Sequence, residues 1–216
     1  MVNFVSPSGR QPPKGVTVHE LTDGPARFRR DVFPAKARLF ARLAMTHRPK
    51  TLFIGCSDAR VVPELITQSE PGELFVVRTA GNLVPAYASG PDGVAASIEY
   101  AVAVLGVNDI VICGHSACGA MTALAEEHDL SATPMIAGWL RHADSATARA
   151  AAVPAAPDTP DVATLVRANV HAQLKNLATH PSVARAVAAR TLTLRGWIFD
   201  IATGAIETID GAAVVA

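Results

Sequence analysis

The sequence predicts an α/β fold in which a mostly parallel central β-sheet is flanked by helices. Short apolar runs that end in small or polar residues alternate along the chain with segments of helical periodicity. These runs are nearly continuous in hydrophobic residues, as expected for strands of a parallel sheet buried on both faces. Half of the 216 residues are hydrophobic, which is enough for a sizeable core.

The N-terminal part of the chain is predicted to be an arm that leads into a helix. Residues 1–26 begin with the Pro- and Gly-rich stretch MVNFVSPSGRQPPKG and are expected to be flexible, whereas residues 27–216 are expected to form a single α/β domain. From residue 28 to about residue 45, large apolar side chains recur at helical spacing. This N-terminal helical arm is expected to be kinked or divided at Pro34.

Strands and helices are predicted to alternate in the middle of the chain. Apolar runs that end in loop-forming residues indicate three buried strands, at residues 51–58, 73–82 and 109–114. Between the second and third strands, residues 91–106 form a predicted helix with Pro and Asp at its start and Gly at its end. A further helix is expected directly after the third strand.

The last third of the chain is predicted to hold two helices and a strand pair. The Ala- and Pro-rich stretch 145–161 is expected to be a linker or irregular loop, preceded by a short helix that contains Trp139. Helical patterns cover residues 163–180 and 182–190, separated by a His-Pro pair. In residues 191–210, apolar and polar side chains alternate on both sides of a Thr-Gly pair. This pattern predicts a strand, a turn and a second strand.

Composition excludes several classes of partner. Nineteen basic and nineteen acidic residues give a formal net charge of zero, which argues against nucleic acid or an anionic membrane as partner. We find no apolar run of membrane-spanning length, no secretory signal and no nucleotide-binding glycine motif after a strand. A cytoplasmic location is therefore expected. Three cysteines, an odd number in a reducing compartment, favour metal binding or catalysis over a disulfide framework.

Two loops that follow predicted strands, CSDAR and GHSAC, carry the candidate chemistry. Because the carboxyl ends of parallel strands meet at one edge of a sheet, Cys56 can lie beside His115 and Cys118. If a helix begins at His115, that residue and Cys118 share one face, one turn apart. Two cysteines and a histidine suit zinc, and three protein ligands leave a fourth position for water, which is typical of a catalytic site.

Other interpretations of these residues stay open. His and Cys often occupy cores as packed residues, and Cys113, inside an apolar run, is interpreted as core. Cys56 could also act as a nucleophile without metal. Arg60 can hold the Asp58 carboxylate bidentately, so that Asp58 either accepts a hydrogen bond from a metal-bound water or becomes a fourth ligand. Without a metal, the same pair is an ordinary loop salt bridge.

The combination C-S-D-x-R…H-x-x-C resembles the β-class carbonic anhydrases, in particular the bacterial and plant-type branch that includes the enzymes accompanying cyanate degradation. The similarity runs from about residue 27 to the C-terminal strands. It implies one Zn²⁺ per chain on Cys56, His115 and Cys118, with Asp58 and Arg60 as catalytic dyad. Such an enzyme hydrates CO₂ reversibly to bicarbonate and a proton, through zinc-bound hydroxide that the dyad orients.

The resemblance also implies a homodimer or tetramer whose active site opens at the subunit interface. By position, the substrate pocket would be lined by Phe75, Ala80 and Tyr100, with the backbone N–H of Gly119 facing the substrate. His47 stands where plant-type members carry a Gln that binds substrate. Core packing is the competing interpretation for the aromatic residues, and helix packing for Gly119.

Three further positions bear on this resemblance. Ala59 and Thr79 replace the Ser and Asn that the family usually carries. Phe53 stands near the place where members with an Asp-closed site have a Trp, which favours the open form. Two other functions fit the same scaffold, namely a hydrolase of COS or CS₂ and a zinc-stabilised module without turnover. The intact dyad argues against the second of these.

Overall fold

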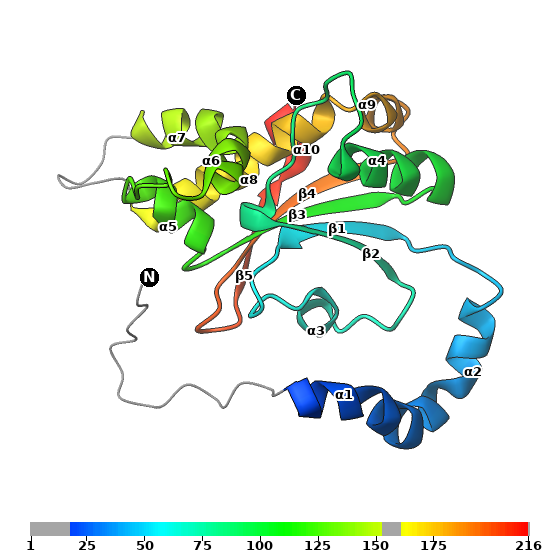
Figure 1. Ribbon diagram of the computed structural model, residues 1–216. Helices are drawn as coiled ribbons and strands as arrows, with labels where there is room; N and C mark the ends of the chain where they lie inside the picture. Colours follow the sequence, from blue (N-terminus) through cyan, green and yellow to red (C-terminus); the bar gives the residue numbers. More distant parts are fainter. Residues whose placement is uncertain (1–17, 153–160, 216) are drawn as a thin grey trace. The chain divides into compact units, whose positions relative to one another are not determined.

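A five-stranded sheet organises the part of the chain from His47 onward (Figure 1). The computed structural model describes residues 18–152 and 161–215. The sheet has the order β2-β1-β3-β4-β5, in which β5 alone runs antiparallel to its neighbour. This arrangement confirms the predicted mostly parallel sheet. The strands are β1 (Thr51–Cys56), β2 (Leu74–Thr79), β3 (Asp109–His115), β4 (Thr193–Phe199) and β5 (Ile206–Asp210).

Helices flank this sheet, and most of them were expected from the sequence. In Figure 1, α4, α8 and α9 lie on one face of the sheet and α3 lies on the other. Helices α3 and α10 were not predicted, because segments of five residues carry too little periodicity. The helical elements of this unit are α3 (Pro63–Thr67), η2 (Ala80–Asn82), α4 (Gly93–Glu99), η3 (Tyr100–Leu105), α5 (Gly119–Ala125), α6 (Pro134–Leu140), η4 (Arg141–Ala143), α7 (Asp144–Ala151), α8 (Val162–Ala178), α9 (Pro181–Ala188) and α10 (Gly211–Val215).

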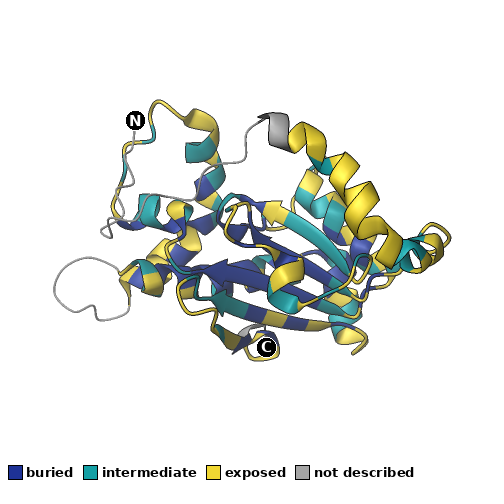
Figure 2. Cartoon of the chain, turned by 90° about the horizontal axis from the view of Figure 1, so that it is seen from below, coloured by how far each residue is buried: buried dark blue, intermediate teal, exposed yellow. Residues whose placement is uncertain are grey.

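The core lies between the sheet and its helices. Strands β1 and β3 are buried along almost their whole length and appear dark blue in Figure 2. Alternate residues of these strands point to opposite faces. Ile54 and Ile112 pack with Leu174 of α8 in the larger cluster, whereas Phe53 and Cys113 pack with Trp197 on the other face. Cys113 is thus a core residue, as predicted.

The N-terminal residues form a separate unit up to Thr46. Its helices are α1 (Val18–Arg27), the π-helical turn η1 (Phe28–Val32) and α2 (Phe33–Leu43). Helical structure therefore begins ten residues before the predicted start, inside the segment expected to be a flexible arm. The rest of that segment, residues 1–17, lies outside the described residues, and the predicted domain boundary stays a prediction. Within the unit, Phe28 packs edge-on against the rings of Phe33 and Phe40, at 6.1 and 6.0 Å.

The predicted linker at 145–161 is wrong in its first half. Residues Asp144–Ala151 form α7, and residues 153–160 lie outside the described part of the chain. Alanine is the strongest helix former, and Ala146 and Ala150, four residues apart, are both buried in the cluster that includes α8. The predicted short helix around Trp139 is confirmed as α6. In the described residues, no helix is long and apolar enough to cross a bilayer.

Gly196 allows α8 to lie close to β4. A Cβ atom at this position would lie 2.7 Å from Val170 Cγ1 and 3.1 Å from Leu174 Cδ1. We therefore expect Gly196→Ala to lower the free energy of unfolding by about 1–3 kcal/mol, because the methyl group overpacks the core. Urea unfolding followed by tryptophan fluorescence measures this change. Gly138→Ala is the control, since nothing lies within 4 Å of its added Cβ and the change should be neutral or stabilising. Equal stability of the two variants would contradict the expected close packing.

Candidate metal centre

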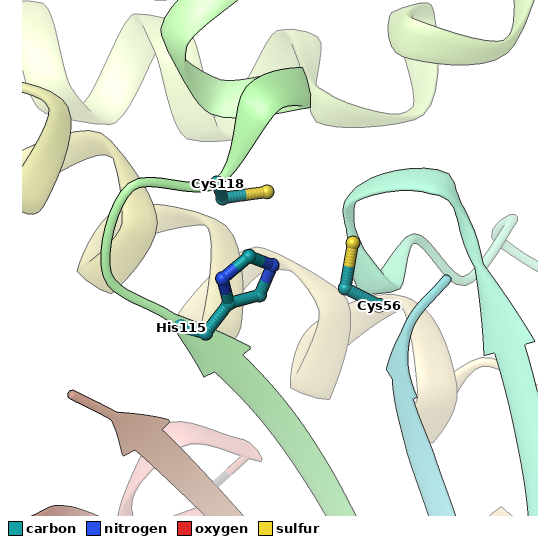
Figure 3. A group of neighbouring side chains, drawn as sticks. All are labelled: Cys56, His115 and Cys118. Atoms are coloured by element: carbon teal, nitrogen blue, oxygen red, sulfur yellow. The ribbon is translucent and has the colours of Figure 1, made fainter. Parts of the chain in front are cut away.

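Three buried donor atoms meet at the carboxyl edge of the sheet. Cys56 is the last residue of β1, His115 is the last residue of the adjacent parallel strand β3, and Cys118 immediately precedes α5. Figure 3 shows the two sulfur atoms and the imidazole ring turned toward one another. Their ligand atoms all lie within 4.8 Å of one another. Donors that share one zinc ion lie roughly 4 Å apart, so the sequence prediction of this cluster agrees with the structure.

The imidazole of His115 is prepared to bind a metal. Its Nδ1 lies 2.9 Å from the carbonyl oxygen of Ser116, and a carbonyl only accepts, so Nδ1 carries the hydrogen. The lone pair is then on Nε2. This atom is buried and has no hydrogen-bond partner among the described residues. A buried acceptor without a partner is costly, and a metal ion between the two thiols would satisfy it.

A tight turn, rather than a helix, brings His115 and Cys118 together. The prediction that both residues share one helix face is wrong, since His115 ends a strand and Cys118 is extended, at φ −68° and ψ 118°. Between them, Ala117 has a φ of +52°, in the left-handed region that is unfavourable for a residue with a Cβ atom. Such backbone strain is frequent at functional sites. Helix α5 begins only at Gly119.

The two thiols interact, and their pKa values move in opposite directions. Interaction with the Cys118 thiol is the main reason why the pKa of Cys56 falls to about 4, and His115 and the backbone N–H groups of Asp58 and Gly81 lower it further. The pKa of Cys118 is raised, first by its interaction with Cys56 and then by burial. One thiolate therefore forms easily and the second needs a cation beside it. This is the charge pattern expected of a ligand pair that releases protons when it binds metal.

A carboxylate and a guanidinium lie beside the donors. Arg60 donates from Nε to Asp58 Oδ1 at 2.9 Å and from Nη2 to Oδ2 at 2.6 Å. The same Nη2 donates to the carbonyl oxygen of Ala117 at 3.0 Å, so Arg60 joins the loop after Cys56 to the loop that carries Cys118. The Arg60 hydrogen bond holds the pKa of Asp58 down at about 2. Asp58 Oδ2 lies 3.9 Å from His115 Nε2, too far for a hydrogen bond but near enough to face the same small volume.

Comparison with known proteins identifies the family. Residues 51–206 match the family model described as carbonic anhydrase. A carbonic anhydrase of Pseudomonas aeruginosa is 56% identical over 195 residues, which cover 90% of this chain and 89% of that protein. The solved β-carbonic anhydrase CcaA has a TM-score of 0.86 at 38% identity and covers 92% of this chain and 90% of that one. This chain belongs to the β-carbonic anhydrase family.

The resemblance carried by the two motifs is thereby confirmed, and the protein is an enzyme of the carbonic anhydrase type, a lyase. Similarity extends to more distant members of the family. One of two tetrameric β-carbonic anhydrases from the ascomycete Sordaria macrospora has a TM-score of 0.77 at 32% identity, covering 88% of this chain and 95% of that one.

A residue that we did not single out from the sequence, Arg78 at the end of β2, supports the β-carbonic anhydrase centre. Its guanidinium donates to the carbonyl oxygens of Cys56 at 3.0 Å, Asp58 at 2.6 Å and Val61 at 2.8 Å. These three hydrogen bonds from one side chain hold the backbone that carries both Cys56 and Asp58. The run FVVR offered one signal, because an Arg at the end of an apolar strand needs several acceptors nearby.

We expect Arg78→Lys to weaken zinc binding by about 10- to 100-fold, because an ammonium group cannot bond three separate carbonyls as the guanidinium fork does. Release of zinc to a chromophoric chelator measures the change. Arg195→Lys is the control, since Arg195 pairs with Asp109 near the opposite end of the strands. Zinc release by the Arg78 variant at the wild-type rate would show that the loop after β1 keeps its conformation without the hydrogen bonds from Arg78.

The predicted pocket residues separate into two groups. Gly119 follows Cys118 directly, and nothing lies within 4 Å of a Cβ atom added there, so helix packing does not explain this glycine. Ala80 follows β2 at the same edge of the sheet, and its carbonyl accepts a hydrogen bond from Trp139 Nε1 at 2.9 Å. Both positions therefore lie at the edge of the sheet where Cys56, His115 and Cys118 meet.

The aromatic residues form a second group. The ring of Phe75 lies 6.3 Å from that of His47 and 6.0 Å from that of Tyr100. Phe75 is four residues before the end of β2, which places it roughly 13 Å along the strand from the edge with the donors. Within one chain, this row of three rings is therefore apart from the metal centre.

Proposed function

We propose that this enzyme catalyses the reversible hydration of CO₂ to bicarbonate and a proton, with one Zn²⁺ held by Cys56, His115 and Cys118. The observation that carries the proposal is the free, buried Nε2 of His115 between two cysteines, with the Asp58 carboxylate facing it. Zinc, when bound, lowers the pKa of a coordinated water to about 7 and so supplies hydroxide at neutral pH.

The chain itself contributes orientation and charge. Asp58 is ionised throughout the physiological range, so its Oδ2 can accept a hydrogen bond from the reacting water and turn a lone pair of that water toward CO₂. Arg60 holds this carboxylate bidentately and keeps it from rotating. The exposed backbone at Gly119 leaves room for substrate beside Cys118. Burial of all three ligands keeps bulk water away from the donor atoms.

We further propose that the resting site is open, with Asp58 outside the ligand set. Both of its carboxylate oxygens accept hydrogen bonds from Arg60, and Oδ1 also accepts the backbone N–H of Arg60 at 2.9 Å. Ligation by Asp58 would require breaking part of this network. The enzyme is proposed to act in the cytoplasm, where its thiols stay reduced.

The test is stopped-flow CO₂ hydration across pH, with zinc quantified in the same sample. One zinc per chain and fast hydration at neutral and alkaline pH would support the proposal. Stoichiometric zinc with no hydration would instead favour a hydrolase of COS or CS₂, or a zinc-stabilised module without turnover. Absence of zinc would favour an enzyme that uses Cys56 as a nucleophile. A hydration rate that collapses steeply below neutral pH would contradict the open resting state.

Assembly is expected to complete the active site. The row formed by His47, Phe75 and Tyr100 leaves Tyr100 43% exposed, and we propose that it lines the pocket of a second copy of the chain. The N-terminal elements η1 and α2 contain no buried residues, and we propose that these helices pack on that partner.

Light scattering should therefore give a mass at least twice the 22.5 kDa of one chain. Tyr100→Glu should weaken the assembly and lower CO₂ hydration together, because an ionised carboxylate would be buried in the interface. Tyr87→Glu, at another exposed tyrosine, is the control. A monomer at working concentration would contradict the proposal.

A further inference from the structure

A second group of ionisable side chains surrounds a cavity where α7, α8, β5 and α10 meet. The cavity has a volume of about 290 Å³. Three of its lining residues are basic, one is acidic and two are apolar: Arg149, His171, Lys175, Asp210, Ile209 and Ala213. None of these residues belongs to the metal centre or the dyad, and none was singled out from the sequence.

The two permanent positive charges of this cavity, Arg149 and Lys175, exceed its single lining acid, Asp210. Along α8, Arg167, His171 and Lys175 follow one another at intervals of four residues, an arrangement in which like charges repel. Arg167 is paired with Glu207. In residues 18–152 and 161–215, Arg149, His171 and Lys175 have no ion-pair partner.

The acid of the cavity bonds to the backbone rather than to one of the bases. Asp210 Oδ1 accepts the backbone N–H of Ala212 at 2.9 Å and forms no ion pair with the three bases. The pKa of His171 is lowered, first by burial and then by Arg149, Arg167 and Lys175. The cavity is therefore a concave site with more basic than acidic groups in its lining.

We propose that this cavity binds a small doubly charged oxyanion, with inorganic phosphate as the physiological ligand. A guanidinium presents two parallel N–H donors to such an anion, an ammonium adds a point charge, and a protonated imidazole adds a third donor. Ile209 and Ala213 add apolar surface to the lining.

Binding should be linked to the protonation of His171. Arg149 from α7, Arg167 and Lys175 from α8, and Asp210 from β5 are the charged groups that face it. A bound dianion would outweigh the repulsion from the three cations and raise the pKa of His171 above its value in the free enzyme. A group whose pKa rises on binding makes binding tighter below that pKa, so affinity should increase as pH falls.

Sulfate is the probe, because it stays doubly charged between pH 5 and 8 whereas phosphate titrates itself. Calorimetric titration of the zinc-loaded enzyme at constant ionic strength should give saturable binding, about tenfold tighter at pH 5.5 than at pH 8. Arg149→Gln and Lys175→Gln should each weaken it about tenfold. His171→Gln should remove most of the pH dependence. Phosphate should compete with sulfate at pH 8.

The control variant is Arg141→Gln, which removes the same charge from an 81% exposed side chain outside the cavity. It should bind sulfate like the wild type. Equal weakening by Arg141→Gln and Arg149→Gln would reveal only general charge attraction and would overturn the proposal. Binding unchanged in all the cavity variants would place the anion at the metal centre and would also overturn it. Neither result would affect the proposed hydration of CO₂.

Discussion

Cys118→Ser is expected to abolish zinc retention and to lower CO₂ hydration by at least about a thousandfold, because the metal supplies the hydroxide at neutral pH. A hydroxyl group is far less acidic than a thiol, so the substituted side chain cannot supply the second anionic donor. The remaining pair, Cys56 and His115, would hold zinc weakly. Zinc per chain after dialysis and stopped-flow hydration measure the two effects.

The chain contains its own control for this prediction. Cys113 is buried like Cys118, but it lies on the opposite face of the sheet among Phe53 and Trp197, and burial raises its pKa to about 12. Cys113→Ser should keep one zinc per chain, since its Sγ already lies 3.4 Å from the carbonyl of Gly114 and a hydroxyl can donate there. Zinc lost from the Cys113 variant and kept by the Cys118 variant would refute the assigned ligand set.

Asp58→Asn should lower kcat by about 100- to 1000-fold while zinc is retained, because an amide can turn its NH₂ group toward the water that the carboxylate orients. The free energy of unfolding should change little at neutral pH, since this pair is partly exposed to solvent. The folded pKa of about 2 lies below the ordinary value of 3.8. The stabilisation from this ion pair is therefore complete above about pH 4 and is lost as pH falls toward 2.

The pH profile separates the role of Asp58 from that of a titrating base. Since its carboxylate stays ionised from pH 5 to 9, no limb of the wild-type hydration profile should come from Asp58, and the Asn variant should keep every limb of that profile at a lower plateau. Asp129→Asn, an exposed carboxylate whose pKa is also lowered, is the control and should leave kcat unchanged. Loss of a limb of the profile in the Asp58 variant would contradict this assignment.

The strands and the clustering of Cys56, His115 and Cys118 were predictable because they depend on local pattern and one topological rule. Cys56 and His115 end neighbouring parallel strands, so a prediction of the strands also predicted their proximity. The turn at Ala117 was not predictable, because a left-handed alanine contradicts the local preference of the residue. The contacts of Arg78 depend on the register between β1 and β2, which hydrophobic pattern alone does not define. Helix α7 was not predicted, because the prolines that follow it indicated an irregular loop.

The hydrogen bond from Arg60 to the carbonyl of Ala117 affects how the site would take up its metal. It connects the loop after β1 to the loop after β3 through protein atoms alone. The two loops of the proposed ligand set are therefore joined by a bond that needs no ion, and we expect little conformational entropy to be lost when zinc binds. We therefore expect that removal of zinc by a chelator leaves the fold intact, so that the enzyme regains its metal without refolding.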